Sequence, residues 1–299
     1  MLILLAGPAL ADPLRVATWH GDFSRKGPGL LLRELLSDKA PDVSAVAVLS
    51  PDVLVLTDLD YDAGHVALGV LADKLGGYPH VFALRPNTGM ATGLDLDGDG
   101  RLGGPRDAQG YGWFAGQGGL ALLSRYPLTL VADHTARLWK DTPDTLWTSD
   151  EPEGQRLSTS AHWAVRVDAP VPFTLLTLAA PPPVFDGPED RNGRRNHDEV
   201  MLWAHELDRG LAGPVVLAGL LNLDPARGEG LRAAAERVLT HPRLQDPLPQ
   251  LPTVDWDSVG EMRVSYVLPD AGLKVLNAGI TPVPGSGPHR VVWVDLAMP

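Results

Sequence analysis

The sequence predicts an α/β fold in which two β-sheets pack face to face and helices cover their outer sides. Short apolar runs bounded by Gly, Pro and Asp are typical of buried strands, and amphipathic stretches lie irregularly between them. The strands outnumber the helices, which excludes the strict alternation of a barrel or a dinucleotide-binding fold. No Gly-rich phosphate loop opens a helix and no composition break marks a linker, so residues 12–299 are predicted to form a single domain.

Nine apolar runs are predicted as strands. They are Leu14–Trp19, Val53–Thr57, His80–Leu84, Gly119–Ser124, His162–Val167, Phe173–Ala179, Val215–Leu221, Met262–Leu268 and Val291–Leu296. Four stretches place apolar residues at helical spacing and are predicted as helices: Gly29–Leu36, Gly64–Leu75, Arg195–Leu207 and Glu229–Leu239. Residues 85–118 and 127–160 are rich in Gly, Pro and Asp, and we expect them to be long loops.

Composition excludes several classes of protein. The chain has 299 residues, with 25 Lys and Arg against 37 Asp and Glu, so its net charge is −12. Such a chain is not expected to hold nucleic acid tightly by counterion release. A hydrophobic content of 44% excludes a disordered chain. Cysteine is absent, which excludes disulfides, thiolate metal sites and a cysteine nucleophile.

Residues 1–11 resemble a short or truncated secretory signal. The apolar run LILLAGPALA ends in Ala9-Leu10-Ala11, the small-x-small pattern that signal peptidase accepts, although no basic segment precedes it. We therefore expect a periplasmic or secreted protein that begins near Asp12. The run is shorter than the ~20 residues of a membrane span, and no other segment reaches that length.

The strongest local motif is Asp95-Leu-Asp97-Gly-Asp99-Gly-Arg101. Alternating aspartates with glycines at the turn resemble the first half of a calcium-binding loop. The twelfth position, where a glutamate would complete the loop, is Arg106, and Asp107 is the candidate substitute. The motif therefore predicts a Ca²⁺ site, and the alternative is a solvated acidic turn.

A second acidic cluster follows a predicted strand. Asp58, Asp60 and Asp62 come after Val53–Thr57, and their alternation places them on one face at the strand's carboxyl end. Carboxylates in this position are candidate metal ligands, and an ordinary polar strand exit is equally consistent with the spacing.

Arginines gather in the segment Asp186–Glu199, which leads into a predicted helix. Arg191, Arg194 and Arg195 are candidate phosphate ligands, because guanidinium groups match the geometry of phosphate oxygens. The segment also contains many acids, so a self-paired salt-bridge network is the alternative. His162, His197 and His289 lie near predicted strand or helix ends and are further candidates.

Taken in order, seven segments resemble the endonuclease/exonuclease/phosphatase superfamily. They are RVATWHGDFSRKGPGLLLRELL, PDVLVLTDLDYD, the insertion RPNTGMATGLDLDGDGRLGGPRDAQGYGWFAGQGGLALLSRYP, PPPVFDGPEDRNGRRNHDE, VVLAGLLNLDP, RVSYVLP and PHRVVWVDL. The insertion is the most specific of them and is similar to a bacterial branch of the superfamily. The resemblance implies a four-layer α/β sandwich and divalent-metal hydrolysis of phosphodiesters or phosphomonoesters, with Mg²⁺ or Mn²⁺ as the cofactor.

The resemblance assigns catalytic positions to His20, Asp58, Asn222 and His289, and metal binding to Asp58 with Asp60 beside it. His20 stands where members usually have Asn, and Asp58 replaces a metal-binding Glu. Asn222 and His289 match the family residues. The resemblance also allows a phosphorylated ligand at Arg191, Arg194, Arg195 and His162.

Other catalytic positions carry residues that cannot do the chemistry. Ala179 stands in the position of a catalytic His, and Leu220 replaces the aspartate that orients or deprotonates the attacking water. Ser265 replaces a further aspartate. The loss of one catalytic group often lowers the rate ~10²–10⁴-fold.

We therefore expect weak or absent hydrolysis in a retained scaffold that binds a phosphorylated small molecule or phosphodiester. One alternative is an active metal-dependent phosphoesterase with a rebuilt site that uses His20, Asp58, Asp60, Asn222 and His289. The other is a calcium-stabilised extracellular binding domain.

Overall fold

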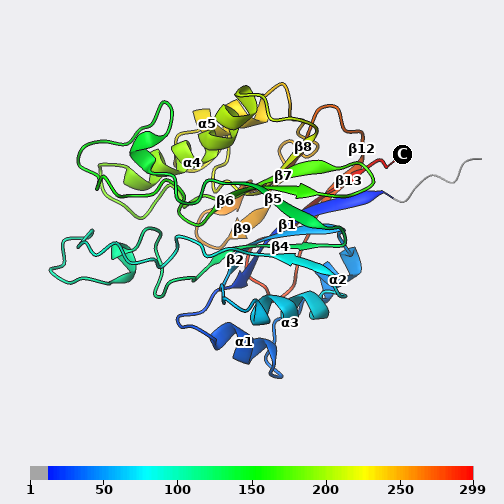
Figure 1. The fold of residues 1–299 in the computed structure, drawn as a ribbon, viewed down its shortest axis with the longest axis horizontal. Helices are drawn as coiled ribbons and strands as arrows, with labels where there is room; N and C mark the ends of the chain where they lie inside the picture. Colours follow the sequence, from blue (N-terminus) through cyan, green and yellow to red (C-terminus); the bar gives the residue numbers. More distant parts are fainter. Residues whose placement is uncertain (1–12, 299) are drawn as a thin grey trace, which may run out of the picture.

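A computed structural model describes residues 13–298, so the predicted signal segment 1–11 lies outside the described residues. Two β-sheets pack face to face (Figure 1). The first has the strand order β12-β13-β1-β2-β4-β3 and the second the order β11-β8-β7-β6-β5. A separate hairpin joins β9 to β10. The strands of the first sheet are β1 (Leu14–Phe23), β2 (Val53–Leu59), β3 (His80–Phe82), β4 (Gly119–Ser124), β12 (Val275–Thr281) and β13 (Val291–Leu296). The remaining strands are β5 (Leu128–Asp133), β6 (His162–Val167), β7 (Phe173–Ala179), β8 (Val215–Leu220), β9 (Val254–Trp256), β10 (Gly260–Met262) and β11 (Ser265–Pro269).

Three hydrophobic clusters separate four layers. The largest lies between the two sheets and includes Val55, Leu122, Trp163 and Val216. Helices α1 (Leu30–Leu35), α2 (Ser44–Leu49) and α3 (Val66–Lys74) cover the outer face of the first sheet, and α4 (Arg191–Asp208) and α5 (Ala233–Leu239) cover that of the second (Figure 1). The expected four-layer α/β sandwich is confirmed.

Several elements, among them β5, β9, β12 and α2, were not predicted from the sequence. Strand β5 lies inside the segment 127–160 that was expected to be a loop, and β12 and α2 were missed altogether. β5 and β12 are edge strands of their sheets, and most of their side chains are partly or fully exposed. An edge strand needs no continuous apolar run, because one side of it meets solvent. The apolar pattern is therefore weakest at these edges.

Helix α4 begins earlier than predicted. It starts at Arg191 rather than Arg195, so the arginine-rich segment forms the first turns of the helix and not a loop. This fixes the direction of each guanidinium group relative to the helix axis. No helix in the described part of the chain is both long and apolar enough to cross a bilayer.

The topology brings four strand ends to one edge of the sandwich. β1 runs parallel to β2, and β7 runs parallel to β8, so the carboxyl ends of each pair lie together. The long segments between β3 and β4 and between β5 and β6 project at one end of the molecule (Figure 1). Gln155 donates hydrogen bonds to Gln109 and so joins the two segments.

Candidate functional site

A cavity of about 900 Å³ opens at this edge of the sandwich. Three of the predicted catalytic residues, His20, Asp58 and Asn222, line it. Ala179 and Leu220 line it as well, so the positions that the family resemblance marked as substituted lie beside the retained ones. A volume of this size is typical of small-molecule pockets, which occupy ~300–1,000 Å³.

Backbone irregularities turn Asp58 toward the cavity. The register of β2 shifts against β4 between Thr57 and Leu59, and Asp58 itself has a φ of 73°. Bulges of this kind often re-aim a side chain beside an active site. A Cβ on Gly118 would lie 2.8 Å from Asp58 Oδ1, so only glycine leaves room for the carboxylate.

The two histidines lie side by side. His20 Nδ1 is 3.1 Å from Thr57 Oγ1, and His20 Nε2 is 3.8 Å from Asp58 Oδ2. The ring of His289 lies 4.3 Å from that of His20, and Trp256 packs edge-on against the other side of His289. His289 is not among the residues that line the cavity, and its buried Nδ1 has no hydrogen-bond partner.

Burial shifts the protonation of these groups. It raises the pKa of Asp58 to about 8, with the negative charges of Asp22 and Asp60 adding to the effect. Burial lowers the pKa of His20 to about 3 and that of His289 to about 4, and the neighbouring His289 contributes to the shift of His20. Both imidazoles are therefore neutral at pH 7, and neither is a proton donor there.

Ala179 and Leu220 form an apolar part of the cavity wall. They are paired residues at the ends of β7 and β8, and both belong to the hydrophobic core between the sheets. A methyl and an isobutyl group can neither transfer a proton nor ligate a metal ion. At these two positions the wall therefore contributes shape and no acid–base chemistry.

The three predicted phosphate-binding arginines have different environments. Arg191 and Arg195 line the cavity, whereas Arg194 does not. Arg191 pairs with Glu151 at 2.7 Å, and Arg194 pairs with the same carboxylate at 2.9 Å. Arg191 and Arg194 are therefore part of a salt-bridge network within the protein, which the sequence analysis gave as the alternative to phosphate binding.

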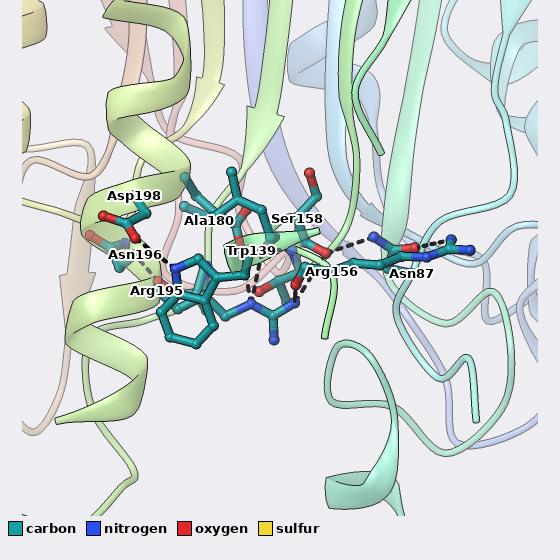
Figure 2. A network of polar contacts seen from close by, with 12 residues as sticks. Asn87, Trp139, Arg156, Ser158, Ala180, Arg195, Asn196 and Asp198 are labelled. Atoms are coloured by element: carbon teal, nitrogen blue, oxygen red, sulfur yellow. Dashed lines mark hydrogen bonds and ion pairs between the residues drawn. The ribbon is translucent and has the colours of Figure 1, made fainter. Parts of the chain in front are cut away.

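Arg195 binds the backbone of the segment before β6. Its guanidinium donates hydrogen bonds to the backbone carbonyls of Arg156, Leu157 and Ser158 (Figure 2). Burial lowers its pKa to about 10, so it stays charged at pH 7. Its Nε and Nη2 thus bind the protein's own backbone, while Arg195 also lines the cavity, and phosphate binding by Arg195 stays a prediction.

His162 is fully buried and does not reach the cavity. Its Nδ1 lies 2.7 Å from Ser158 Oγ, and its Nε2 lies 3.0 Å from the carbonyl of Glu199. Burial lowers the pKa of His162 to about 3. Both ring nitrogens therefore already have protein partners, and contact of His162 with a phosphorylated ligand stays a prediction.

The acidic cluster after β2 does not share one face. Asp60 is buried and accepts hydrogen bonds from the amides of Arg25 and Gly118, and burial raises its pKa to about 6. Asp62 points elsewhere, because its carboxylate accepts hydrogen bonds from the first amides of α3. Asp62 thus caps a helix, while Asp58 and Asp60 remain close enough to influence each other.

The DLDGDGR loop brings three carboxylates together. Oxygen atoms of Asp95, Asp97 and Asp99 lie within 4.8 Å of one another, and all three residues are exposed. Asp97 also lines the cavity. Asp107, the candidate fourth ligand, is buried, and its carboxylate accepts hydrogen bonds from the amides of Leu96 and Gly104.

Among the described residues at the catalytic positions, no three His, Asp or Glu side chains place ligand atoms within 4.8 Å of one another for a divalent metal such as Mg²⁺ or Mn²⁺. Among the described residues, the Asp95 loop is the one group of three ligand side chains with atoms within 4.8 Å of one another. At the catalytic positions, Asp58 and His20 provide two donors 3.8 Å apart. Two donors leave most of the six oxygen ligands of Mg²⁺ to be supplied by water or substrate.

Several cavity residues were not predicted from the sequence. Tyr111 comes from the insertion and Phe185 from the segment before α4, and both are exposed aromatic side chains. Thr88, Thr159 and Ser160 also line the cavity, although their hydroxyl oxygens are buried. Tyr111 and Phe185 could have been found from the sequence, because they are aromatic residues inside polar, Gly-rich segments. Single Ser or Thr residues in loops give no comparable sequence signal.

Solved structures share this fold over nearly the whole chain. An endonuclease/exonuclease/phosphatase from Beutenbergia cavernae has a TM-score of 0.62 at 20% identity, covering 96% of this chain and 72% of that one. The human Nocturnin catalytic domain with bound sulfate has a TM-score of 0.56 at 16% identity, covering 97% and 95%. An AP endonuclease from Archaeoglobus fulgidus has a TM-score of 0.56 at 12% identity, covering 94% and 98%.

The sequence matches no curated protein closely enough to count as a relative. The model of the endonuclease/exonuclease/phosphatase family, in contrast, matches residues 19–287. Together with the two packed sheets and the cavity at their shared edge, this match shows that the chain belongs to the endonuclease/exonuclease/phosphatase family.

Proposed function

We propose that the chain binds a phosphorylated small molecule or phosphodiester in the cavity and hydrolyses it weakly or not at all. One observation carries this proposal: Ala179 and Leu220 line the same cavity as His20, Asp58 and Asn222. In-line attack on phosphorus needs a positioned water, charge neutralisation and stabilised equatorial oxygens. An apolar pair at two of the positions leaves the first requirement without a base.

The unpartnered Nδ1 of His289 supports the same conclusion. A catalytic imidazole is usually held in one tautomer by a carboxylate or carbonyl on its second nitrogen. His289 Nδ1 is buried and makes no such bond. Its ring is held instead by packing against His20 and Trp256.

The test is hydrolysis of a panel of phosphomonoesters and phosphodiesters by the full chain, with Mg²⁺, Mn²⁺ or Ca²⁺ and an EDTA control. We expect no metal-dependent turnover above the level of an Asp58→Ala variant, together with measurable binding of at least one phosphorylated compound by calorimetry. Turnover that survives repurification and falls in both Asp58→Ala and His289→Ala would overturn the proposal.

That contrary outcome would favour a rebuilt active site. The observation in its favour is the 3.8 Å separation of His20 Nε2 and Asp58 Oδ2, which lets one cation contact both. An imidazole ligand favours a transition metal over Mg²⁺. Activity with Mn²⁺ or Zn²⁺ but not Mg²⁺ would distinguish this second candidate.

We further propose that Asp95, Asp97 and Asp99 bind Ca²⁺ and that the protein is periplasmic or secreted. Three carboxylates with oxygens within 4.8 Å repel one another unless a cation lies between them.

The net charge of −12 argues against nucleic acid as a tight partner, so a small phosphorylated compound is the favoured ligand. Signal processing of residues 1–11 can be tested by mass spectrometry of the periplasmic fraction.

A further inference from the structure

The Glu151 carboxylate lies between two arginines from the first turn of α4. Its Oε2 is 2.7 Å from Arg191 Nε, and its Oε1 is 2.9 Å from Arg194 Nη2. The Glu151 side chain is 6% exposed, so solvent and salt screen these ion pairs little. Two guanidinium groups thus share one buried carboxylate, which leaves one positive charge in excess.

Arg191 is the arginine of this pair that reaches the cavity. It lines the cavity, and its side chain is 23% exposed. Besides the ion pair with Glu151, its Nη2 donates a hydrogen bond to Gln155 Oε1 at 3.1 Å. A guanidinium has more N–H donors than these two contacts use. Arg191 can therefore offer donors to a ligand, but its charge is partly neutralised by the protein itself.

Arg194, in contrast, is held by the protein at all three of its nitrogens. Besides the ion pair, its Nη1 donates to the carbonyl of Leu146 at 2.9 Å and its Nε to the carbonyl of Glu189 at 3.1 Å. Its guanidinium carbon lies 5.6 Å from the ring centre of Trp139, whose indole N–H is bound to Asp198 of α4 (Figure 2). Arg194 therefore stays beside the buried carboxylate whatever occupies the cavity.

This difference allows a phosphate to draw Arg191 away from Glu151. A buried carboxylate without a cation is strongly destabilising, and Arg194 prevents that state when Arg191 turns toward a ligand. A phosphate group carries a charge of about −1.5 to −2 near pH 7 and has three strong acceptor oxygens, so it competes well with a single carboxylate. The exchange keeps every charge paired.

The other acidic residues of the cavity wall near Arg191 compete less. Glu189 and Asp186 are exposed, so water and salt screen their charges. Their carboxylates accept hydrogen bonds from the backbone amides of Gly187 and Asn192, respectively. The buried Glu151 is therefore the main rival of a phosphate for this guanidinium.

We propose that Glu151 sets the affinity of the cavity for phosphate by competing for Arg191. Without ligand the ion pair holds Arg191, and a phosphate group displaces the carboxylate from it, while Arg194 keeps that carboxylate neutralised. The inference rests on the proposed binding of a phosphorylated compound. Glu151 is a positioning residue here, because it acts through Arg191 and does not itself line the cavity.

Calorimetric titration of the full chain with inorganic phosphate at low ionic strength tests the competition. Glu151→Gln removes the negative charge and keeps the shape of the side chain, so it should raise the affinity for phosphate about tenfold. The matched control is Glu153→Gln, the same change at an exposed carboxylate that pairs with Lys140, and it should leave the affinity unchanged. Wild type that binds phosphate no more weakly than Glu151→Gln overturns the competition and leaves the proposed function intact. Binding by none of the variants overturns both.

A double-mutant cycle with Arg191→Met separates competition from a general change in charge. Glu151→Gln should raise the affinity about tenfold when Arg191 is present and should have little effect when Arg191 is replaced, because the carboxylate then has no rival. A merely structural role of Glu151 would alter the affinity equally in both backgrounds. Equal effects would therefore overturn the proposal.

Arg194→Met provides a second measurement that does not depend on the folding of Glu151→Gln. Arg194 does not line the cavity, and its removal leaves Arg191 as the remaining arginine of the pair beside Glu151. Arg191 should then be held more firmly, and phosphate binding should weaken about threefold or more. Arg209→Met, at the other end of α4, controls for the loss of one positive charge. An affinity equal to that of the control would overturn the proposal.

Discussion

The imidazole rings of His20 and His289 lie with centroids 4.3 Å apart and planes inclined by 49°. Burial lowers the pKa of both rings, so the pair is neutral at pH 7 and does not repel. His20 lines the same cavity as the apolar Leu220 and Ala179, which can neither transfer a proton nor ligate a metal ion.

Replacing the apolar Leu220 and Ala179 by the residues that the family usually has at these positions should restore activity. We expect Leu220→Asp with Ala179→His to raise Mn²⁺- or Mg²⁺-dependent hydrolysis of bis(p-nitrophenyl) phosphate by ~10²-fold or more, since single catalytic groups contribute ~10²–10⁴. The matched control is Leu220→Asn with Ala179→Gln, which is polar but cannot exchange protons. A reconstructed protein that is folded and binds metal, yet remains silent, would contradict the account of the cavity wall.

Calcium should stabilise the protein through the Asp95 loop. With Ca²⁺ at 100 times its dissociation constant, linkage predicts about 2.7 kcal/mol of added stability, measured as a higher melting temperature. Asp97→Ala should abolish this shift, because it removes the central carboxylate of the three. Asp150→Ala, at an exposed position outside the cluster, is the control. A shift that persists in Asp97→Ala would show that calcium binds elsewhere.

Arg195 should matter more for stability than the exposed Arg209 at the end of α4. Arg195→Met leaves the carbonyls of Arg156 and Leu157 without this donor, and Glu199 without its ion-pair partner. We expect a loss of ~3–5 kcal/mol in the free energy of unfolding, measured by urea denaturation. Arg209→Met removes an exposed guanidinium from the end of α4 and should cost under ~1 kcal/mol. Similar losses in both variants would mean that the buried network contributes little.

Acid should destabilise the fold through His162. Its folded pKa is lowered to about 3 by burial, against an unfolded value near 6.5, so the stability it contributes is complete above pH 6.5. That stability is lost as the pH falls toward 3, at about 1.4 kcal/mol per pH unit between pH 6 and pH 4.

The readout is the difference between wild type and His162→Gln. This difference isolates the histidine from Glu199, whose pKa burial raises to about 8 and which therefore favours folding as the pH falls from 8 to 4.5. We expect the variant to lack the acid-dependent loss, and His205→Gln, on a partly exposed face of α4, to behave as wild type. Parallel pH curves for wild type and His162→Gln would show that the imidazole can charge in place.

The sequence by itself determined the fold class, most central strands and the order of the family's motifs. The segments Val53–Thr57 and Val215–Leu220 are buried throughout, so their apolar runs are unambiguous. Arginines, aspartates and histidines in the motif segments were also visible, as was the acidic loop. These features are local, because each depends on a few consecutive residues.

Tertiary structure alone decided which of these residues act together. Asp58 and Asp62 differ in direction because a bulge turns one toward the cavity and α3 captures the other. Arg195 faces backbone carbonyls and His162 faces Ser158, partners far away or unmarked in the sequence. Hydrogen-bond partners across such separations are set by how sheets and helices pack, which no local pattern encodes. Leu220 and His20 are likewise 200 positions apart in the sequence, and only the packing of the two sheets brings both to the lining of the same cavity.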